Sequence, residues 1–171
     1  MLVALKSERE LRAYARDGSA ATHLVKTWHI LAASGGSGPK LCEGDSQVPE
    51  GIYRIESLNP NSRFHVGLRV GYPNEDDLVQ AKADGRDLGA LGGDIMIHGS
   101  DVSIGCLAIG DAAIEEVFVL TARTGVSRVE VLLCPGLSPQ TFACIDATPW
   151  VVARYRLLSE RLALIDAELA K

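Results

Sequence analysis

A histidine and a cysteine lie eight positions apart in the run IMIHGSDVSIGCLAIGD, and their types suit nucleophilic catalysis. A thiol attacks a carbonyl as thiolate, so it needs a base and donors for the oxyanion that forms. His98 can take the proton of Cys106, while the carbonyl of Gly99 can hold the other ring nitrogen. Gly105 and Cys106 offer consecutive backbone N–H groups to the oxyanion, and Ser103 can support the loop or the substrate. We expect the two side chains to form a hydrogen-bonded or nearly bonded pair.

The same two residues also allow a structural or a metal-binding interpretation. A lone cysteine is most often a small buried side chain, and a lone histidine is most often a satisfied structural residue. A metal site would need more ligands than His98 and Cys106. Asp94, Asp101 and Asp111 lie nearby, but one cysteine and one histidine with carboxylates form an uncommon zinc set. Spacing alone does not decide between the catalytic, structural and metal-binding interpretations. We predict no metal.

The other cysteines, Cys42, Cys134 and Cys144, show no C-x-x-C spacing with one another or with Cys106. This pattern argues against a zinc ribbon and against a thioredoxin-like redox motif. A Cys134–Cys144 disulfide is possible, but spacing does not predict it. We expect these three residues to be structural or incidental and Cys106 alone to be required for turnover.

Length and charge exclude several classes of protein. The 171 residues suffice for one domain with a sizeable core. With 17 basic and 22 acidic residues and no basic block, the chain is not expected to bind nucleic acid. No apolar run approaches the roughly 20 residues that span a bilayer. The first residues also lack the pattern of a signal peptide, so we expect either a cytoplasmic protein or a mature chain whose leader was removed.

The elements that must position these residues are mostly strands. Residues 2–31 contain three extended segments separated by turns, which predicts an antiparallel meander. In SRFHVGLRV, apolar residues from Phe64 onward alternate with polar ones, as in a half-buried strand. Residues 71–93 are mostly polar and are interpreted as a surface loop with room for one helical turn. Residues 94–99 then return as a buried strand.

Two helices are expected in the second half of the chain. Asp111 can cap a helix that runs to about Arg123 and that Gly125 ends. A long helix starts at Thr148 and Pro149. Its apolar residues repeat at spacings of four and three, and we favour packing on its own sheet over a coiled coil; they are Val151, Tyr155, Leu158, Leu162, Ile165 and Leu169.

Three runs of the sequence carry a resemblance to a known family. The run IMIHGSDVSIGCLAIGD resembles the active-site segment of the L,D-transpeptidase catalytic domain (YkuD-type) family, in particular its YafK-like branch. GPKLCEGDSQVPEGIYRI and NSRFHVGLRVGYPNEDD are similar to the family's Pro-Glu-Gly run and to the strand and Tyr-Pro-Asn loop after it. Together they lie within residues 34–120. The resemblance implies a mainly β (α+β) fold, a mixed β-sandwich or barrel-like catalytic domain over 1–147, with a C-terminal amphipathic helix over 148–171 packed on it or extending from it.

The resemblance also implies an activity that uses no cofactor. Cys106 would attack the carbonyl of a diaminopimelate residue in a peptidoglycan stem peptide and form a thioester. His98 would act as base and Gly99 as its orienter, and Gly105 with Cys106 would form part of the oxyanion hole. The family implies a periplasmic or cell-envelope location, while the lack of a signal peptide leaves the cytoplasm open.

The sequence departs from typical members in two ways that match the YafK-like branch. The histidine lies closer to the cysteine, and Leu107 and Ala108 follow the cysteine where an apolar residue and Arg or Asn are usual. In that branch, cleavage of the amide between an outer-membrane lipoprotein and peptidoglycan is implied. We therefore favour hydrolysis over cross-link-forming or protein-attaching transpeptidation. The rivals are a cytoplasmic thiol peptidase or acyltransferase and an inactive wall-binding module.

Without that arginine, another cation must bind the free carboxylates of a stem peptide. Arg63, His65 and Arg69 occupy alternate positions of one predicted strand and could form a charge-assisted carboxylate site. An ordinary solvated sheet face is the alternative. Tyr72, at the start of the next loop, is a further candidate. The expected partners are stem peptides and a peptidoglycan-linked lipoprotein.

Overall fold

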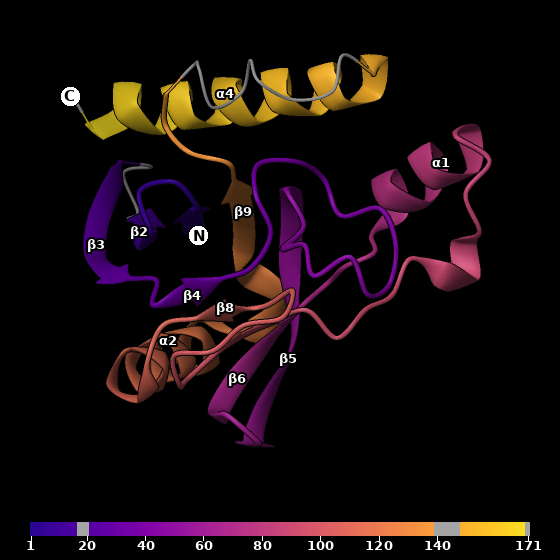
Figure 1. Cartoon of the computed structure of the whole chain (residues 1–171). Coiled ribbons are helices and arrows are strands. Elements are labelled where there is room, and N and C mark those ends of the chain that lie inside the picture. The colour runs from indigo at the N-terminus through magenta and orange to yellow at the C-terminus, as the bar shows by residue number, and fades with distance from the viewer. Residues whose placement is uncertain (17–20, 139–147, 170–171) are drawn as a thin grey trace.

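The computed structural model describes residues 1–16, 21–138 and 148–169. Within them the chain forms a nine-stranded sheet in the order β3-β2-β1-β9-β5-β6-β7-β8-β4. Three α-helices accompany the described part of the sheet (Figure 1). The elements are β1 (Leu2–Leu5), β2 (Glu10–Arg16), β3 (Thr22–His29), β4 (Ala32–Ala33), β5 (Gly51–Ser62), β6 (His65–Val70), α1 (Glu75–Ala83), β7 (Met96–His98), β8 (Leu107–Ala108), α2 (Asp111–Thr124), β9 (Glu130–Cys134) and α4 (Pro149–Leu169). The α+β class is confirmed.

The N-terminal strands form the meander that the sequence predicts, since β2 pairs antiparallel with both β1 and β3. Strand β1 also pairs in parallel with β9, so the sheet is mixed. The long strand β5 pairs with β9 through its first residues and with β6 through its later ones. It thereby joins the meander to the half of the sheet that contains His98.

Each face of the sheet has its own core, because successive side chains of a strand point to opposite faces. Val3 and Leu5 of β1 pack in a cluster with residues of α4, whereas Leu2 and Ala4 pack in a second cluster with Ile114 of α2. Figure 1 shows α4 above the sheet and α2 below it. The two helices therefore cover opposite faces.

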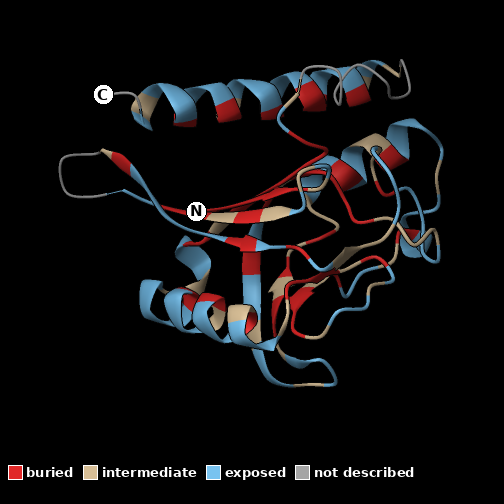
Figure 2. Cartoon of the chain, turned by 60° about the vertical axis from the view of Figure 1, so that its left-hand side comes forward, coloured by how far each residue is buried: buried red, intermediate tan, exposed pale blue. Residues whose placement is uncertain are grey.

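The C-terminal helix packs on the sheet and does not extend away from it. The predicted apolar stripe is buried from Val151 to Ile165, and Figure 2 shows these buried positions on the side of α4 that faces the sheet. Tyr155 donates a hydrogen bond of 2.5 Å to Glu50, whose other carboxylate oxygen lies 2.9 Å from Nζ of Lys6. The predicted domain boundary after residue 147 adjoins 139–147, which lie outside the described residues.

The prediction of a surface loop with one helical turn over residues 71–93 is wrong. Helix α1 occupies nine of these residues, and a short 3₁₀ helix follows at Leu88–Ala90. The helix begins at Asn74, whose side chain accepts from the N–H of Asp77, while the Asp77 carboxylate accepts from the N–H of Asn74. This reciprocal capping box satisfies two N–H groups and stabilises a helix that lacks a strong apolar periodicity.

Two further local predictions need correction. Helix α2 is capped by Gly110, at φ 82°, and Asp111 is its first residue; the Asp111 carboxylate accepts from the N–H of Ser100 at 2.8 Å. Phe64 was expected on the buried face of its strand but is 39% exposed. The reason is His65, which follows Phe64 at the start of β6 and has φ 74°. This left-handed residue breaks the two-residue alternation between Phe64 and the rest of the strand.

Candidate active site

Strands β7 and β8 bring the predicted base and nucleophile to one face of the sheet. They pair in parallel, with His98 opposite Ala108. Paired residues share a face, and Cys106 lies two positions before Ala108, so His98 and Cys106 project on the same side. The intervening residues Ile97 and Leu107 pack into the core on the opposite side. The register of two short strands therefore assembles the pair.

His98 is held in a single orientation. The residue is 2% exposed, and its Nδ1 lies 2.6 Å from the carbonyl oxygen of Gly99. Because a carbonyl only accepts, Nδ1 carries the proton, and Nε2 keeps a free lone pair. The ring of Phe64 stacks on the imidazole at 4.7 Å and 27°. Burial lowers the pKa of His98, so the imidazole is neutral near pH 7 and can act as a base.

Cys106 lies directly before β8 and is half-buried. Its Sγ accepts from the N–H of Met96 at 3.4 Å and donates to the carbonyl oxygen of Asp94 at 3.7 Å. Burial raises the pKa of the Cys106 thiol, although the Met96 N–H and the Lys40 cation act in the opposite direction. The side chain of Cys106 is therefore a neutral thiol rather than a thiolate.

Within the described residues, no hydrogen bond joins His98 to Cys106. The thiol proton points to Asp94 instead, and Nε2 of His98 has no hydrogen-bond partner in the described part of the chain. Catalytic hydrogen bonds are often long or badly aligned until substrate binds. The arrangement is thus a neutral thiol and a neutral imidazole on one face of the sheet.

Two serine hydroxyls bind the N–H groups that the sequence suggests for the oxyanion. The N–H of Gly105 donates to Oγ of Ser34 at 2.5 Å, and the N–H of Cys106 donates to Oγ of Ser103 at 3.2 Å. Ser103 also donates to the carbonyl oxygen of Cys106 at 2.6 Å and lies 3.2 Å from the Ser34 hydroxyl. Ser103 therefore fixes the loop before Cys106, while Ser34 occupies the Gly105 N–H that the sequence suggests for the oxyanion.

A pocket of about 450 Å³ shares residues with the surroundings of Cys106, although neither Cys106 nor His98 lines it. Its wall includes Asp94 and Met96, whose backbones contact Sγ of Cys106, and Phe64, which stacks on His98. Two of the predicted substrate residues, Arg63 and Arg69, also line it. The remaining lining residues are Ser57, Leu58, Asn59 and Ser62.

The other two predicted substrate residues lie elsewhere. The ring of His65 turns toward helix α2, where Nε2 lies 2.7 Å from Glu115. Tyr72 is 5% exposed, packs edge-on against Tyr53, and its hydroxyl donates to the carbonyl oxygens of Lys40 and Leu91. The structure therefore brings Arg63 and Arg69 together at the pocket and places His65 and Tyr72 outside its lining.

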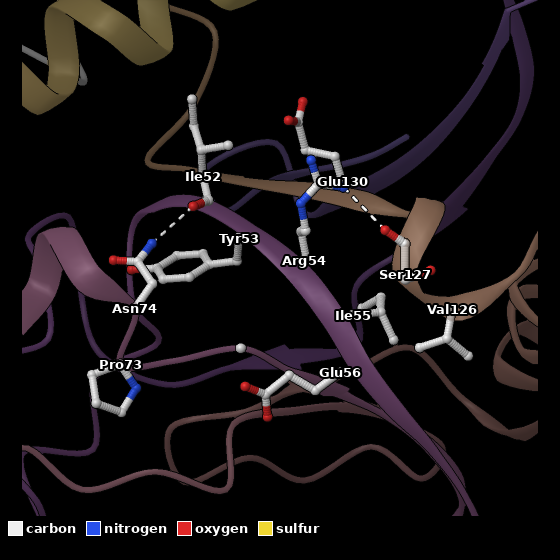
Figure 3. A pocket seen from close by; sticks show the side chains of 11 residues that line it. Ile52, Tyr53, Arg54, Ile55, Glu56, Pro73, Asn74, Val126, Ser127 and Glu130 are labelled. Carbon is white, nitrogen blue, oxygen red and sulfur yellow. Dashed lines mark hydrogen bonds between the residues drawn. The ribbon is translucent and has the colours of Figure 1, made fainter.

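A pocket of about 790 Å³ lies along β5, away from His98 and Cys106. Figure 3 shows Asn74 donating to the carbonyl oxygen of Ile52 and Arg54 donating to that of Ser127. These polar side chains bind backbone groups of the pocket wall rather than converging on its centre. This pocket is larger than the one near Cys106, so pocket volume alone does not identify the candidate active site.

No group of three or more metal-ligating side chains occurs in the described part of the chain. Asp94 binds Arg69 and Asp111 binds the backbone of Ser100, so neither carboxylate joins the histidine and cysteine. None of the described helices is long and apolar enough to cross a bilayer. Cys144 lies outside the described residues, so the possible disulfide with Cys134 stays a prediction.

Comparison with known proteins identifies the family. The model of the L,D-transpeptidase catalytic domain, YkuD, matches residues 1–131. The chain belongs to this family. It is similar to YafK of Escherichia coli strain K12 and of strain O157:H7, each 38% identical over 135 residues, covering 76% of this chain and 51% of the relative. This YkuD-family chain thus spans about half the length of these curated relatives.

A solved structure shows the same fold at low sequence identity. The YkuD-family chain superimposes on Bd1075 of Bdellovibrio bacteriovorus with a TM-score of 0.55 and 17% identity, over 95% of this chain and 55% of that one. Helix α4 lies outside the segment that the family model matches.

Sequence reasoning missed three residues of the candidate site in this YkuD-family chain. Ser34 occurs in a Gly- and Ser-rich loop, and only the fold shows that its hydroxyl reaches Gly105. Met96 contributes a backbone N–H, which no side-chain pattern reveals. Phe64 stacks on His98 because of the turn before β6. Alternating hydrophobicity, the available signal for Phe64, pointed to the wrong face.

Proposed function

We propose that this chain is the catalytic domain of a thiol enzyme that acts on peptidoglycan stem peptides at diaminopimelate. The observation that supports it most is the hydrogen bond from His98 to Gly99, which leaves a basic nitrogen free on the face that also carries Cys106. Such an oriented base beside a thiol is the arrangement that acyl transfer requires. Membership of the L,D-transpeptidase family supports the peptidoglycan substrate.

The reaction starts from the neutral pair. The Cys106 proton moves to Nε2 of His98 as sulfur bonds to the carbonyl carbon of the substrate. The tetrahedral intermediate then breaks its C–N bond, and the leaving amine takes the proton from Nε2. This leaves a thioester on Cys106 and a neutral imidazole, which can deprotonate an incoming water or amine. Attack by that group releases the acyl product, and sulfur regains a proton.

The oxyanion of this intermediate needs donors near Sγ. We assign the N–H of Gly105 to this role, with the oxyanion replacing the hydroxyl of Ser34. Rotation of the Ser34 side chain is sufficient for the exchange, because the hydroxyl is its terminal group. The N–H of Cys106 stays with Ser103, which keeps the loop in place.

Arg63 and Arg69 are the carboxylate anchor of the proposed enzyme. Both line the pocket that also contains Asp94 and Met96, the two residues whose backbones contact Sγ. The position of the usual family arginine is filled by Ala108 of β8, which is fully buried. Hydrolysis is the favoured outcome, with the amide between a lipoprotein and peptidoglycan as the bond cleaved. Cross-link formation with an amine acceptor is the alternative. We propose a cell-envelope location on the basis of the family.

Incubation with isolated sacculi, with and without covalently linked lipoprotein, tests this proposal. Released peptides are identified by mass spectrometry, and the mass of the intact protein is measured to detect an acyl adduct on Cys106. We expect released lipoprotein and a Cys106 adduct, both lost in Cys106→Ala. Cys42→Ala is the matched control, because Cys42 is exposed and lies outside the site. Near wild-type release by Cys106→Ala would show the mechanism to be wrong.

A further inference from the structure

One residue, Asp94, connects Cys106 to a pair of opposite charges. The carbonyl oxygen of Asp94 accepts from Sγ of Cys106 at 3.7 Å, while its carboxylate lies 2.5 Å from Nη1 of Arg69. Arg69 pairs with Met96 across β6 and β7, and the N–H of Met96 is the other contact of Sγ. The charged groups are therefore held close to the reacting sulfur on the same face of the sheet.

This ion pair has features of a binding site rather than of a structural brace. The side chain of Asp94 is 82% exposed and that of Arg69 is 43% exposed, so water screens their attraction and the pair contributes little to stability. Asp94 also adopts φ 54°, a left-handed conformation that Asp and Asn tolerate better than most other residues. An exposed carboxylate is thus held at the pocket by an ion pair that adds little stability.

The chemistry of diaminopimelate matches such a pair. When one of its carboxyl groups is bound in the amide that Cys106 attacks, its other end carries a free ammonium and a free carboxylate on one carbon. A guanidinium and a carboxylate side by side can bind both groups at once, Arg69 taking the carboxylate and Asp94 the ammonium. Phe64, Met96 and Leu58 supply apolar surface for the aliphatic chain between the two ends.

We infer that Arg69 and Asp94 form a subsite for the zwitterionic end of diaminopimelate, in which the substrate's two charges replace the internal ion pair. The inference rests on the proposed function, because it assumes that the stem peptide reaches Cys106. It goes beyond a carboxylate anchor, since Asp94 makes the ammonium a second requirement. Glu56, whose carboxylate lies 3.4 Å from Nε of Arg69, keeps the guanidinium oriented when Asp94 turns to the ligand.

Binding of synthetic stem tetrapeptides to Cys106→Ala tests the subsite without turnover. Four peptides are compared by calorimetry, and the first three carry diaminopimelate, diaminopimelate with its free carboxylate amidated, and lysine in its place. We expect the amidated and lysine peptides to bind about tenfold or more weakly, because each lacks the carboxylate that Arg69 takes. A fourth peptide, acetylated on the free amine, is expected to lose affinity through Asp94.

Variants added to Cys106→Ala assign each charge. Arg69→Gln should weaken binding of the diaminopimelate peptide and leave the lysine peptide unchanged. Asp94→Asn, which tolerates the left-handed backbone, should weaken the diaminopimelate peptide and leave the acetylated one unchanged. Arg54→Gln is the matched control, since Arg54 is exposed on β5 and binds the carbonyl of Ser127 outside this pocket.

Equal affinity for all four peptides, a variant that weakens all four peptides to the same extent, or no binding at all would overturn the subsite. Failure of the proposed function is read separately, from the acyl adduct on Cys106 of the wild-type protein incubated with sacculi. An adduct together with equal peptide affinities removes the subsite and keeps the enzyme. Absence of both the adduct and peptide binding removes the two together.

Discussion

The imidazole of His98 is fixed by its own neighbour in the chain, because Nδ1 donates to the carbonyl oxygen of Gly99 at 2.6 Å. A bond between adjacent residues needs no distant partner, so the proton position survives movements elsewhere in the sheet. Nε2 is left as the basic atom on the face that carries Cys106. The pair is neutral at rest, and its pH dependence follows from that state.

Activity is expected to persist below pH 6.5. Burial lowers the pKa of His98 from its ordinary 6.5, so the imidazole becomes protonated and inactive only at lower pH. Burial raises the pKa of the Cys106 thiol above its ordinary 9.0, so the neutral thiol persists beyond that pH. A profile of kcat/KM should therefore have its acid limb below 6.5 and its alkaline limb above 9.0.

Alkylation of Cys106 by iodoacetamide gives the matching measurement without substrate. The rate, followed by mass spectrometry of the Cys106 peptide, should keep rising beyond pH 9.0, because only the thiolate reacts. A rate that is already constant at neutral pH would contradict the neutral pair. It would indicate a thiolate beside an imidazolium.

The two serines near the nucleophile should differ in effect. Ser103→Ala removes the acceptor of the Cys106 N–H and the donor to its carbonyl, so we expect kcat to fall about tenfold or more as the loop loses its position. Ser34→Ala frees the N–H of Gly105, so kcat should be retained or increased. Exposed Ser37→Ala is the control. Equally large losses in both serine variants would contradict the assignment of Gly105 to the oxyanion.

Gly99→Ala should impair both folding and catalysis. A methyl group at this position would lie 2.8 Å from the carbonyl oxygen of Phe64, 2.9 Å from Cβ of His65, and closer still to the carboxylate of Asp111. Such overpacking costs about 1 to 3 kcal/mol and would displace the carbonyl that holds His98. Thermal unfolding and kcat measure the two effects. Gly36→Ala, which meets no atom within 4 Å, should leave both unchanged.

Arg154→Met should destabilise the packing of α4 on the sheet. The Arg154 guanidinium lies 2.9 Å from the carboxylate of Asp77, and both side chains are buried. Removal of one partner leaves an unpaired buried carboxylate, at a cost of about 3 to 5 kcal/mol in the free energy of unfolding by urea. Exposed Arg156→Ala is the control on the same helix. Recovery of stability in Arg154→Met with Asp77→Asn, whose amide oxygen can still accept from the N–H of Asn74, would attribute the loss to the charge, and no recovery would refute that cause.

The sequence by itself was sufficient for the elements whose signals are local. The meander of the first strands, the strand that ends at His98 and the apolar stripe of α4 follow from periodicity, which depends only on neighbouring residues. The contact of His98 with Gly99 is equally local, since it joins adjacent residues. The family could be recognised for the same reason, because each of the three runs that carry the resemblance is continuous in the chain.

Contacts between distant segments were decided only by the tertiary structure. The Ser34 hydroxyl meets the N–H of Gly105 across 71 positions of the chain, because β4 and β8 are adjacent in the sheet. Arg69 meets Asp94 because of the register between β6 and β7. Register is set by packing of whole strand faces, and a shift of one residue would turn each of these side chains to the opposite face. No local pattern contains that information.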